Sequence, residues 1–221
     1  MSLEIKKLYK YFGEKLVLKN INIKAINGER LGFLGINGSG KTTLLNSIYY
    51  REFKTSGEVN RYYSDYYDDC VFIKDQPDVY NYLTVDEYYE FFKKMVKSSD
   101  LDDYSQRYGE LKKGLKLEGY KEVLIKDLSF GNKRKLYIAS LLSLPSRLYL
   151  IDEPTNGLDT QSIIFLREFL KSDYFAESIV LLSSHLLEFV EKVSIRYFVL
   201  SEGLTEVNSN QCLESTYLSL T

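Results

Sequence analysis

A glycine-rich segment at residues 35–42 has the residue types and spacing to hold the phosphates of a nucleotide. It reads Gly-Ile-Asn-Gly-Ser-Gly-Lys-Thr and satisfies the pattern G-x-x-x-x-G-K-[ST] between an apolar run and a helical stretch. Gly38 and Gly40 let backbone N–H groups close on phosphate oxygens. Lys41 can reach the β and γ phosphates, and the Thr42 hydroxyl can ligate Mg²⁺. The residues predicted to contact the nucleotide here are Gly35, Ile36, Asn37, Gly38, Ser39, Gly40, Lys41, Thr42 and Thr43.

Two adjacent carboxylates, Asp152 and Glu153, follow an apolar run at residues 148–151. An α/β sheet presents ligand-binding residues at strand ends of this kind. Because consecutive residues of a strand point to opposite sides, we expect different roles for the two acids. Asp152 is assigned to the Mg²⁺ shell, through water, and Glu153 to the general base that polarises an attacking water. The alternative is a plain acidic turn at a strand end.

The phosphate loop by itself predicts only that a nucleoside triphosphate binds, which leaves kinases, GTPases and motor ATPases open. An accidental glycine turn ahead of a helix is the competing interpretation. Chance would produce the pattern in a chain of this length about one time in a hundred, and the flanking strand and helix lower that chance further. The loop therefore predicts a nucleotide site, and the acids at the second strand end favour hydrolysis.

The elements that must position these residues begin with alternating apolar positions. The alternation at residues 3–8 and 17–26 predicts antiparallel strands, and Asn27-Gly28 is a hairpin-type turn signal. Later apolar runs are compact and typical of buried parallel strands separated by helices. These runs are residues 31–34, 148–151 and 179–182, with helical stretches from about Lys41 and from Thr160 to Leu170.

The middle of the chain, from about residue 76 to residue 144, changes to helical periodicity. Thr84-Val85-Asp86-Glu87 fits a capping box. The apolar residues predicted to follow on that helix are Val85, Tyr88, Tyr89, Phe92 and Met95. The sequence thus predicts an α/β fold: a P-loop NTPase core with a mainly parallel sheet, an N-terminal antiparallel β subdomain and a helical subdomain. We expect one domain over 1–221, with the core in 1–75 and 145–221 and the helical subdomain in 76–144.

The overall composition is that of an ordinary globular protein. The 221 residues are 44% hydrophobic and 27% charged, and the formal net charge is −2, which argues against a nucleic-acid surface. Cys70 and Cys212 form no CxxC pair, which suits a reducing compartment. No segment approaches the roughly 20 apolar residues of a membrane span, and the first residues lack the apolar core of a signal peptide. We therefore expect a cytosolic chain unless a partner holds it at a membrane.

A longer set of motifs carries a family resemblance. Residues 128–132 read Leu-Ser-Phe-Gly-Asn, and residues 152–159 read Asp-Glu-Pro-Thr-Asn-Gly-Leu-Asp. Together with the phosphate loop and His185 they resemble, from about Leu3 to Gly203, the nucleotide-binding domain of ATP-binding cassette (ABC) transporters. The phosphate loop (Walker A), the signature, the acidic strand end (Walker B), the D-loop and the H-loop occur in the family's order and at similar separations.

The resemblance assigns further residues to the site. Ser129 and Gly131 would bind the γ-phosphate of ATP held by another subunit, although Phe130 and Asn132 depart from the family's LSGGQ. A plain helix cap is the alternative for this segment. Asp159 corresponds to the D-loop aspartate, which in the family acts across a dimer interface. His185, the sole histidine in the sequence, falls at the H-loop position, where it would contact the γ-phosphate and hold Glu153.

At two points of the predicted site the sequence leaves a choice between two adjacent residues. Phe12 falls where the family stacks an aromatic ring on adenine, with Tyr11 as the neighbouring candidate and core packing as the alternative for Phe12. For the Q-loop, counting back from Thr84 selects Asp75, whereas residue identity selects Gln76. Either could offer an oxygen to Mg²⁺ and the attacking water. We favour Gln76, with Thr42 and Asp152 as the other metal-site residues.

The activity that the resemblance implies is hydrolysis of ATP to ADP and phosphate with Mg²⁺, in which Glu153, His185 and Lys41 are catalytic. Two ABC subunits, identical or different, would enclose two ATP molecules and drive an integral-membrane permease from the cytoplasmic face. The alternatives are a soluble ABC ATPase of the iron–sulfur assembly type, a regulatory nucleotide-binding module with weak hydrolysis, and a small-molecule P-loop kinase. A kinase has no need for a signature, a D-loop or His185.

Overall fold

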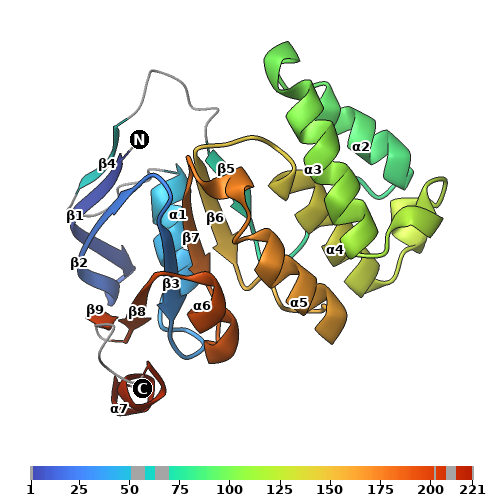
Figure 1. Cartoon of the computed structure of the whole chain (residues 1–221). Helices are drawn as coiled ribbons and strands as arrows, with labels where there is room; N and C mark the ends of the chain where they lie inside the picture. Colours follow the sequence, from blue (N-terminus) through green and yellow to red (C-terminus); the bar gives the residue numbers. More distant parts are fainter. Residues whose placement is uncertain (1, 51–57, 63–69, 202, 208–212, 221) are drawn as a thin grey trace.

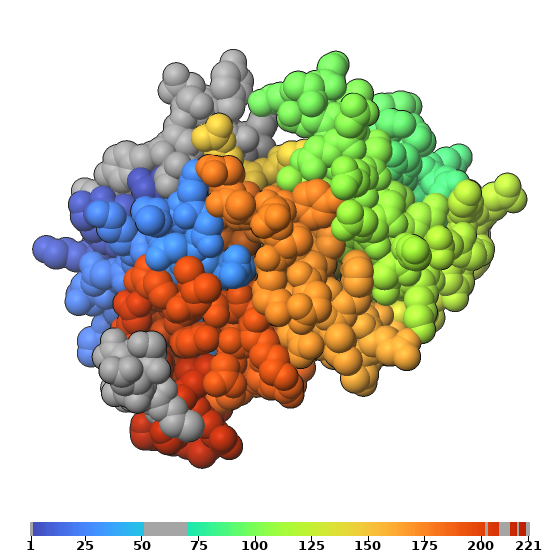
Figure 2. All heavy atoms as spheres, in the orientation of Figure 1, coloured from blue at the N-terminus to red at the C-terminus, as the bar shows by residue number. Residues whose placement is uncertain are grey.

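The chain folds into two β-sheets with helices packed around the larger one (Figure 1). A computed structural model describes residues 2–50, 58–62, 70–201, 203–207 and 213–220, so Cys212 lies outside the described residues. The smaller sheet has the strand order β2-β1-β4, and the larger sheet has the order β5-β6-β7-β3-β8-β9. The two N-terminal strands lie on one side of the molecule and the helical region on the other (Figure 2).

The smaller sheet confirms the antiparallel strands predicted from the N-terminal alternation. β1 (Ser2–Phe12) pairs antiparallel with β2 (Lys15–Ile26) and, on its other edge, with β4 (Glu58–Tyr62). The β1–β2 register places Phe12 directly opposite Lys15 across the turn. The inward-facing positions of β1 and β2 are buried in one hydrophobic cluster, as half-buried strands require.

The turn signal at Asn27-Gly28 marks a turn, but the hairpin expected there is absent. The strand that follows, β3 (Arg30–Leu34), belongs to the larger sheet, so the turn carries the chain from one sheet to the other. Gly28 has φ +79°, and its N–H donates to the carbonyl of Ser178 at 2.8 Å. The turn is therefore fixed by a contact with the segment before β7, not by cross-strand pairing.

The larger sheet confirms the predicted parallel core. Its five parallel strands are β5 (Cys70–Ile73), β6 (Leu148–Asp152), β7 (Ile179–Ser183), β3 and β8 (Arg196–Leu200), and β9 (Leu204–Val207) closes the edge antiparallel to β8. Every residue of β6 and β7 is buried, as expected for strands covered on both faces. The carboxyl ends of β3, β5, β6 and β7 therefore meet at one edge.

Each face of this sheet has its own hydrophobic cluster. Alternate residues of β6 divide between them: Leu148 and Leu150 join the cluster that contains α1 (Lys41–Tyr50) and the antiparallel sheet. Tyr149 and Ile151 join the cluster that contains α4 (Phe130–Leu142), α5 (Thr160–Phe169) and α6 (Leu187–Val193). α7 (Leu213–Leu220) packs beside α6 and β8 near the C-terminus (Figure 1).

The middle of the chain is helical, as predicted, and contributes α2 (Val85–Lys93), α3 (Leu101–Gly114) and α4. The capping box is present: Thr84 Oγ1 accepts from Glu87 N at 3.2 Å, and the Glu87 carboxylate accepts from Thr84 N at 2.7 Å. Met95, predicted on the apolar face of α2, lies beyond its end and is 68% exposed. Its N–H bonds to Phe92 O, so a tight turn ends the helix before Met95 can reach the buried face.

Short 3₁₀ turns lie at Ser98–Asp100, Glu118–Tyr120, Ile125–Asp127 and Asp173–Phe175.

Two glycines test how tightly the helices pack on the sheet. An added Cβ at Gly32, on β3, would lie 2.3 Å from Val190 Cγ1 and 2.5 Å from Ser194 Oγ, whereas one at Gly109, on the exposed face of α3, would meet nothing within 4 Å. We expect Gly32→Ala to lower the free energy of unfolding by about 1–3 kcal/mol through overpacking. Gly109→Ala should raise it by up to about 1 kcal/mol through helix propensity. Urea unfolding of both variants measures the difference, and equal midpoints would contradict this packing.

Candidate functional site

A cavity of about 690 Å³ opens where the carboxyl ends of the parallel strands meet the N-terminus of α1. Its walls come from the β1–β2 hairpin, the phosphate loop and the loops that follow β5, β6 and β7. Strand ends next to a helix N-terminus are where α/β sheets bind phosphorylated ligands. The lining residues are Phe12, Lys15, Val17, Asn37, Gly38, Gly40, Lys41, Thr42, Thr43, Asp75, Glu153, Asn156 and His185.

The glycines of the phosphate loop are required by its backbone. Gly38 and Gly40 have φ values of +84° and +105°, a region that other residues rarely adopt. Lys41, the first residue of α1, is buried, and its Nζ donates to Gly35 O at 2.6 Å and to Ile36 O at 3.3 Å. The same ammonium lies 3.5 Å from Glu153 Oε1, so the loop carries a positive charge into the cavity.

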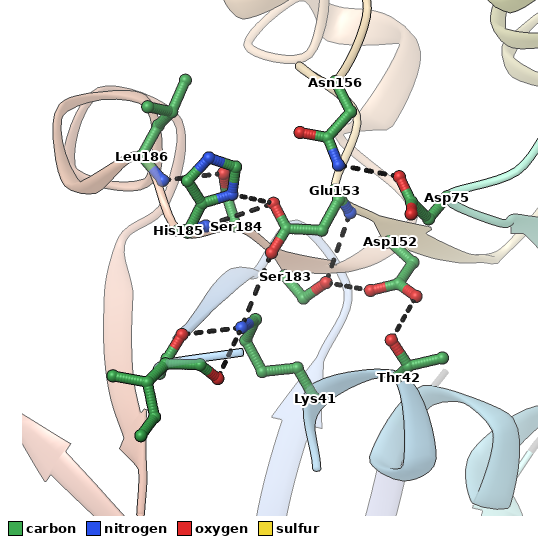
Figure 3. A network of polar contacts seen from close by, with 12 residues as sticks. Lys41, Thr42, Asp75, Asp152, Glu153, Asn156, Ser183, Ser184, His185 and Leu186 are labelled. Atoms are coloured by element: carbon green, nitrogen blue, oxygen red, sulfur yellow. Dashed lines mark hydrogen bonds and ion pairs between the residues drawn. The ribbon is translucent and has the colours of Figure 1, made fainter. Parts of the chain in front are cut away.

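Asp152 ends β6 in a buried network beneath the cavity (Figure 3). Its Oδ2 accepts from Thr42 Oγ1 at 2.7 Å, and its Oδ1 accepts from Ser183 Oγ. Burial raises the pKa of Asp152, while the hydrogen bonds from Ser183 and Thr42 act in the opposite direction. The structure thus brings together the threonine and the aspartate that the sequence assigned to a metal ion.

Glu153 turns away from Asp152 through its backbone. β6 ends at Asp152, and Glu153 adopts a left-handed φ of +46°, which costs roughly 1–3 kcal/mol for a non-glycine residue. Its Oε2 lies 2.8 Å from His185 Nδ1 and accepts from His185 N at 3.2 Å, while Oε1 faces Lys41 (Figure 3). The two acids are separated as expected, but by this turn and not by strand alternation.

Asp75, not Gln76, faces the cavity. The Asp75 carboxylate lines it and accepts from Asn156 Nδ2 at 2.8 Å, whereas Gln76 lines an adjoining hollow of about 570 Å³. β5 ends at Ile73, and the chain bends after Lys74, so the next residue turns towards the loop after β6. This placement reverses the preference for Gln76 that residue identity suggested and agrees with the count back from Thr84.

The signature and D-loop residues lie outside the cavity lining and cap two helices. Ser129 caps α4 and accepts from Asn132 N at 3.3 Å. Asp159 caps α5 and accepts from Ser162 N at 2.9 Å. An ion pair with Lys135 holds the pKa of Asp159 far below its usual range. Gly131 is closely packed, since a Cβ there would lie 2.9 Å from Gly157 O.

Three comparisons with known proteins agree on the family and the fold. Residues 18–156 match the family model for the ABC transporter. The chain belongs to the ABC transporter family. It is 33% identical to the uncharacterized ABC transporter ATP-binding protein YdbJ of Bacillus subtilis (strain 168), over 97% of this chain and 70% of that protein. It is 30% identical to the bacitracin transport ATP-binding protein BcrA of Enterococcus faecalis, over 95% of this chain and 70% of that one.

A solved structure of an ATP-binding subunit of an ABC transporter matches the fold with a TM-score of 0.86 and 24% identity. It covers 100% of this chain and 99% of that chain. This likeness shows the fold, and the family model and the relatives show that the chain is an ATP-binding subunit of the ABC transporter family, with ATPase activity. The cavity of this ABC subunit brings together the phosphate loop, the carboxylates of Asp75 and Glu153, and His185.

The hairpin that closes one side of the cavity in this ABC subunit was only partly predicted. Phe12 lines the cavity and is 59% exposed, which excludes core packing for that ring, while Tyr11 is absent from the lining. Lys15 was missed, although the turn at Gly13 and the strand alternation could have placed it opposite Phe12. Ser183 was also missed as a partner of Asp152, because the β6–β7 register that aligns them is not readable from the sequence.

Phe12 and Tyr11 offer a matched test of base binding in this ABC subunit. We expect Phe12→Ala to weaken ATP binding by about 1–3 kcal/mol, the usual loss when an aromatic ring no longer stacks on a base. Tyr11→Ala should leave the Kd for ATP unchanged, because its ring is not part of the lining. Calorimetric titration of both variants with ATP measures the two affinities. An equal loss of affinity in both would contradict the assignment of Phe12 to base binding.

Proposed function

We propose that the cavity binds ATP with Mg²⁺ and that Glu153 activates the water that attacks the terminal phosphate. The observation that carries this proposal is the Glu153 carboxylate, held between His185 Nδ1 at 2.8 Å and Lys41 Nζ at 3.5 Å inside the cavity. A carboxylate next to a phosphate-binding lysine is placed to accept a proton from water there. The reaction is ATP + H₂O → ADP + phosphate.

The oxygen donors beside the loop fit a magnesium ion. Thr42 Oγ1 and Asp152 Oδ2 lie 2.7 Å apart at the start of α1, and the Asp75 carboxylate lies in the same cavity. Mg²⁺ is usually held by one or two carboxylates together with substrate phosphates and water, and these oxygens offer such a partial set. When bound, Mg²⁺ neutralises phosphate charge. We assign its site to Thr42, Asp152 and Asp75.

The remaining residues orient the substrate and the base. The loop N–H groups and Lys41 would stabilise the negative charge that develops on the phosphate oxygens. His185 holds the Glu153 carboxylate through its backbone N–H and its ring, and that ring would face the γ-phosphate. Phe12 would stack on the adenine. Glu153 would take the proton from the attacking water, so the direction of its carboxylate would determine the rate of hydrolysis.

A charge-removing substitution at the base tests this role. We expect Glu153→Gln to lower kcat for ATP hydrolysis by about 10²–10⁴-fold, the contribution of a general base. The affinity for Mg²⁺·ATP should be retained, because the loop and Lys41 are untouched. Glu188→Gln is the control, since Glu188 is an exposed acid on α6 that pairs with Lys192. Wild-type turnover by the Glu153→Gln chain would refute the assignment.

We also propose that two ABC subunits, identical or different, enclose two ATP molecules. The support is that Ser129, Gly131 and Asp159 lie outside the lining of this chain's own cavity. Ser129 and Gly131 lie at the N-terminus of α4, which is suited to phosphate, and Asp159 caps α5. Each nucleotide would then lie between the loop of one subunit and the signature segment of the other. Closure on ATP and opening after hydrolysis would provide the mechanical output.

A separate integral-membrane permease is the proposed recipient of that motion, with this subunit on the cytoplasmic face. In the described part of the chain, no helix has the length and apolar character to cross a bilayer. We propose that 1–221 is one ABC ATPase domain, with the core in 1–75 and 145–221 and the helical subdomain in 76–144. An apolar hollow of about 480 Å³ in that subdomain supports docking there; it is lined by Val79, Tyr80, Asn81, Tyr82, Leu83 and Phe91.

The hollow provides a test of permease coupling. Tyr82 is 82% exposed at its rim, so a charge there should disturb an apolar partner without disturbing the fold. We expect the tagged chain, purified from mildly solubilised membranes, to bring a multi-spanning protein with it. Tyr82→Asp should lose that protein, and Leu218→Asp, on exposed α7, should keep it. Recovery that is equal in all three chains would contradict docking at this hollow.

A further inference from the structure

A buried arginine on α4 joins the two strand ends that carry the acids of the cavity. Arg134 is fully buried and is the largest such side chain in the described part of the protein. Its Nη1 donates to Lys74 O, and its Nη2 donates to Asp152 O at 3.2 Å and to Glu153 O at 3.0 Å. Lys74 directly follows β5, and Asp152 ends β6, so one guanidinium ties two neighbouring strand ends to a helix.

Stability alone does not account for an arginine at this position. Burial lowers the pKa of Arg134, which means that the site penalises the charge, although Asp75 and Asp152 oppose that effect. Its Nε has no hydrogen-bond partner among the described residues. A buried charge is weak evidence for a gain in stability, because its desolvation opposes the contacts that it makes. The planar fork, which can donate to several carbonyls at once, is what an apolar residue could not supply.

The carbonyl of Glu153 is the acceptor that links Arg134 to the reaction. Glu153 has the left-handed φ of +46°, and its carbonyl accepts from Arg134 Nη2 and from Asn156 N. A backbone held in such a conformation persists only where its surroundings over-determine it. The carboxylate of the same residue points the other way, to His185 and Lys41. Holding the carbonyl on one side therefore fixes the direction of the carboxylate on the other.

Arg134 lies on the helix that Ser129 caps, five residues into the same rigid element. We propose that Arg134 is a positioning residue that acts through the carbonyls of Lys74, Asp152 and Glu153. Through these hydrogen bonds the position of α4 determines the direction of the Glu153 carboxylate and the position of the loop that carries Asp75. It does not line the cavity, so it acts on the hydrolytic step and not on nucleotide binding. This inference rests on the proposed role of Glu153 as the base.

The test compares two buried arginines in the purified full chain. In Arg134→Met we expect kcat for ATP hydrolysis to fall by about 100-fold, the loss that a misplacement of about 1 Å can cause. The Kd for trinitrophenyl-ATP with Mg²⁺ should stay near wild type, whereas the melting temperature should fall, because three backbone carbonyls lose a buried donor. Arg134→Lys should give an intermediate kcat, because an ammonium lacks the planar fork. Arg107→Met is the control: Arg107 is buried on α3 and donates to Tyr149 Oη at 3.2 Å, so it also joins a helix to β6.

Three results would overturn the proposal: an unchanged kcat in Arg134→Met, a loss of nucleotide affinity in proportion to the loss of kcat, or an equal loss of kcat in Arg107→Met. If the methionine variant fails to fold, Arg134→Lys tests the proposal. We expect a reduced kcat with an unchanged Kd in that variant, and a wild-type kcat would contradict the proposal. Wild-type turnover in the Glu153→Gln chain would instead contradict the role of Glu153 as the base, whatever the arginine variants do. Failure of the proposed function and failure of this inference are therefore distinguishable.

Discussion

The register between β6 and β7 is the constraint on which the rest of the site depends. Asp152 pairs with Ser183 across the two strands, and this pairing brings the serine hydroxyl to the aspartate carboxylate. One residue later, Glu153 N donates to Ser183 O at 3.0 Å, and the chain leaves the sheet. A shift of one residue would move the side chains of the shifted strand to the opposite face of the sheet and separate the acids from the phosphate loop.

Because the strand ends are fixed in this way, two acids of the same kind acquire different surroundings. Asp152 stays buried among hydroxyl donors, where burial raises its pKa. Glu153 reaches the cavity beside a lysine and a histidine. The left-handed turn between them is stabilised by hydrogen bonds from Asn156 N and from the guanidinium of Arg134 to Glu153 O. The site therefore depends as much on buried backbone contacts as on the residues that line the cavity.

Much of this arrangement could be predicted from the sequence, because it is encoded by local patterns. The glycine spacing before Lys41, the apolar runs that became β3, β6 and β7, and the capping box at Thr84 each report a physical requirement of a few neighbouring residues. These patterns were enough to predict the parallel core, the antiparallel strands and a nucleotide site between the loop and the strand ends, while the place of His185 came from the family resemblance.

The features that could not be predicted depend on tertiary contacts. Asn27-Gly28 turns between two sheets because its partner is the distant Ser178, and no local pattern reports that. Asp75 lines the cavity and Gln76 the adjoining hollow because of how the chain bends after β5, which residue identity does not report. The contacts of Arg134 likewise reach residues 60 and 18 positions away in the sequence, and no local pattern reports them.

The most direct measurement is a crystal structure of the chain with a non-hydrolysable ATP analogue and Mg²⁺. Our account predicts that the terminal phosphate lies against Lys41 and that the metal lies at Thr42 Oγ1. A water should lie between the terminal phosphorus and the Glu153 carboxylate. A nucleotide bound elsewhere, or a Glu153 side chain turned away from the terminal phosphorus, would contradict it.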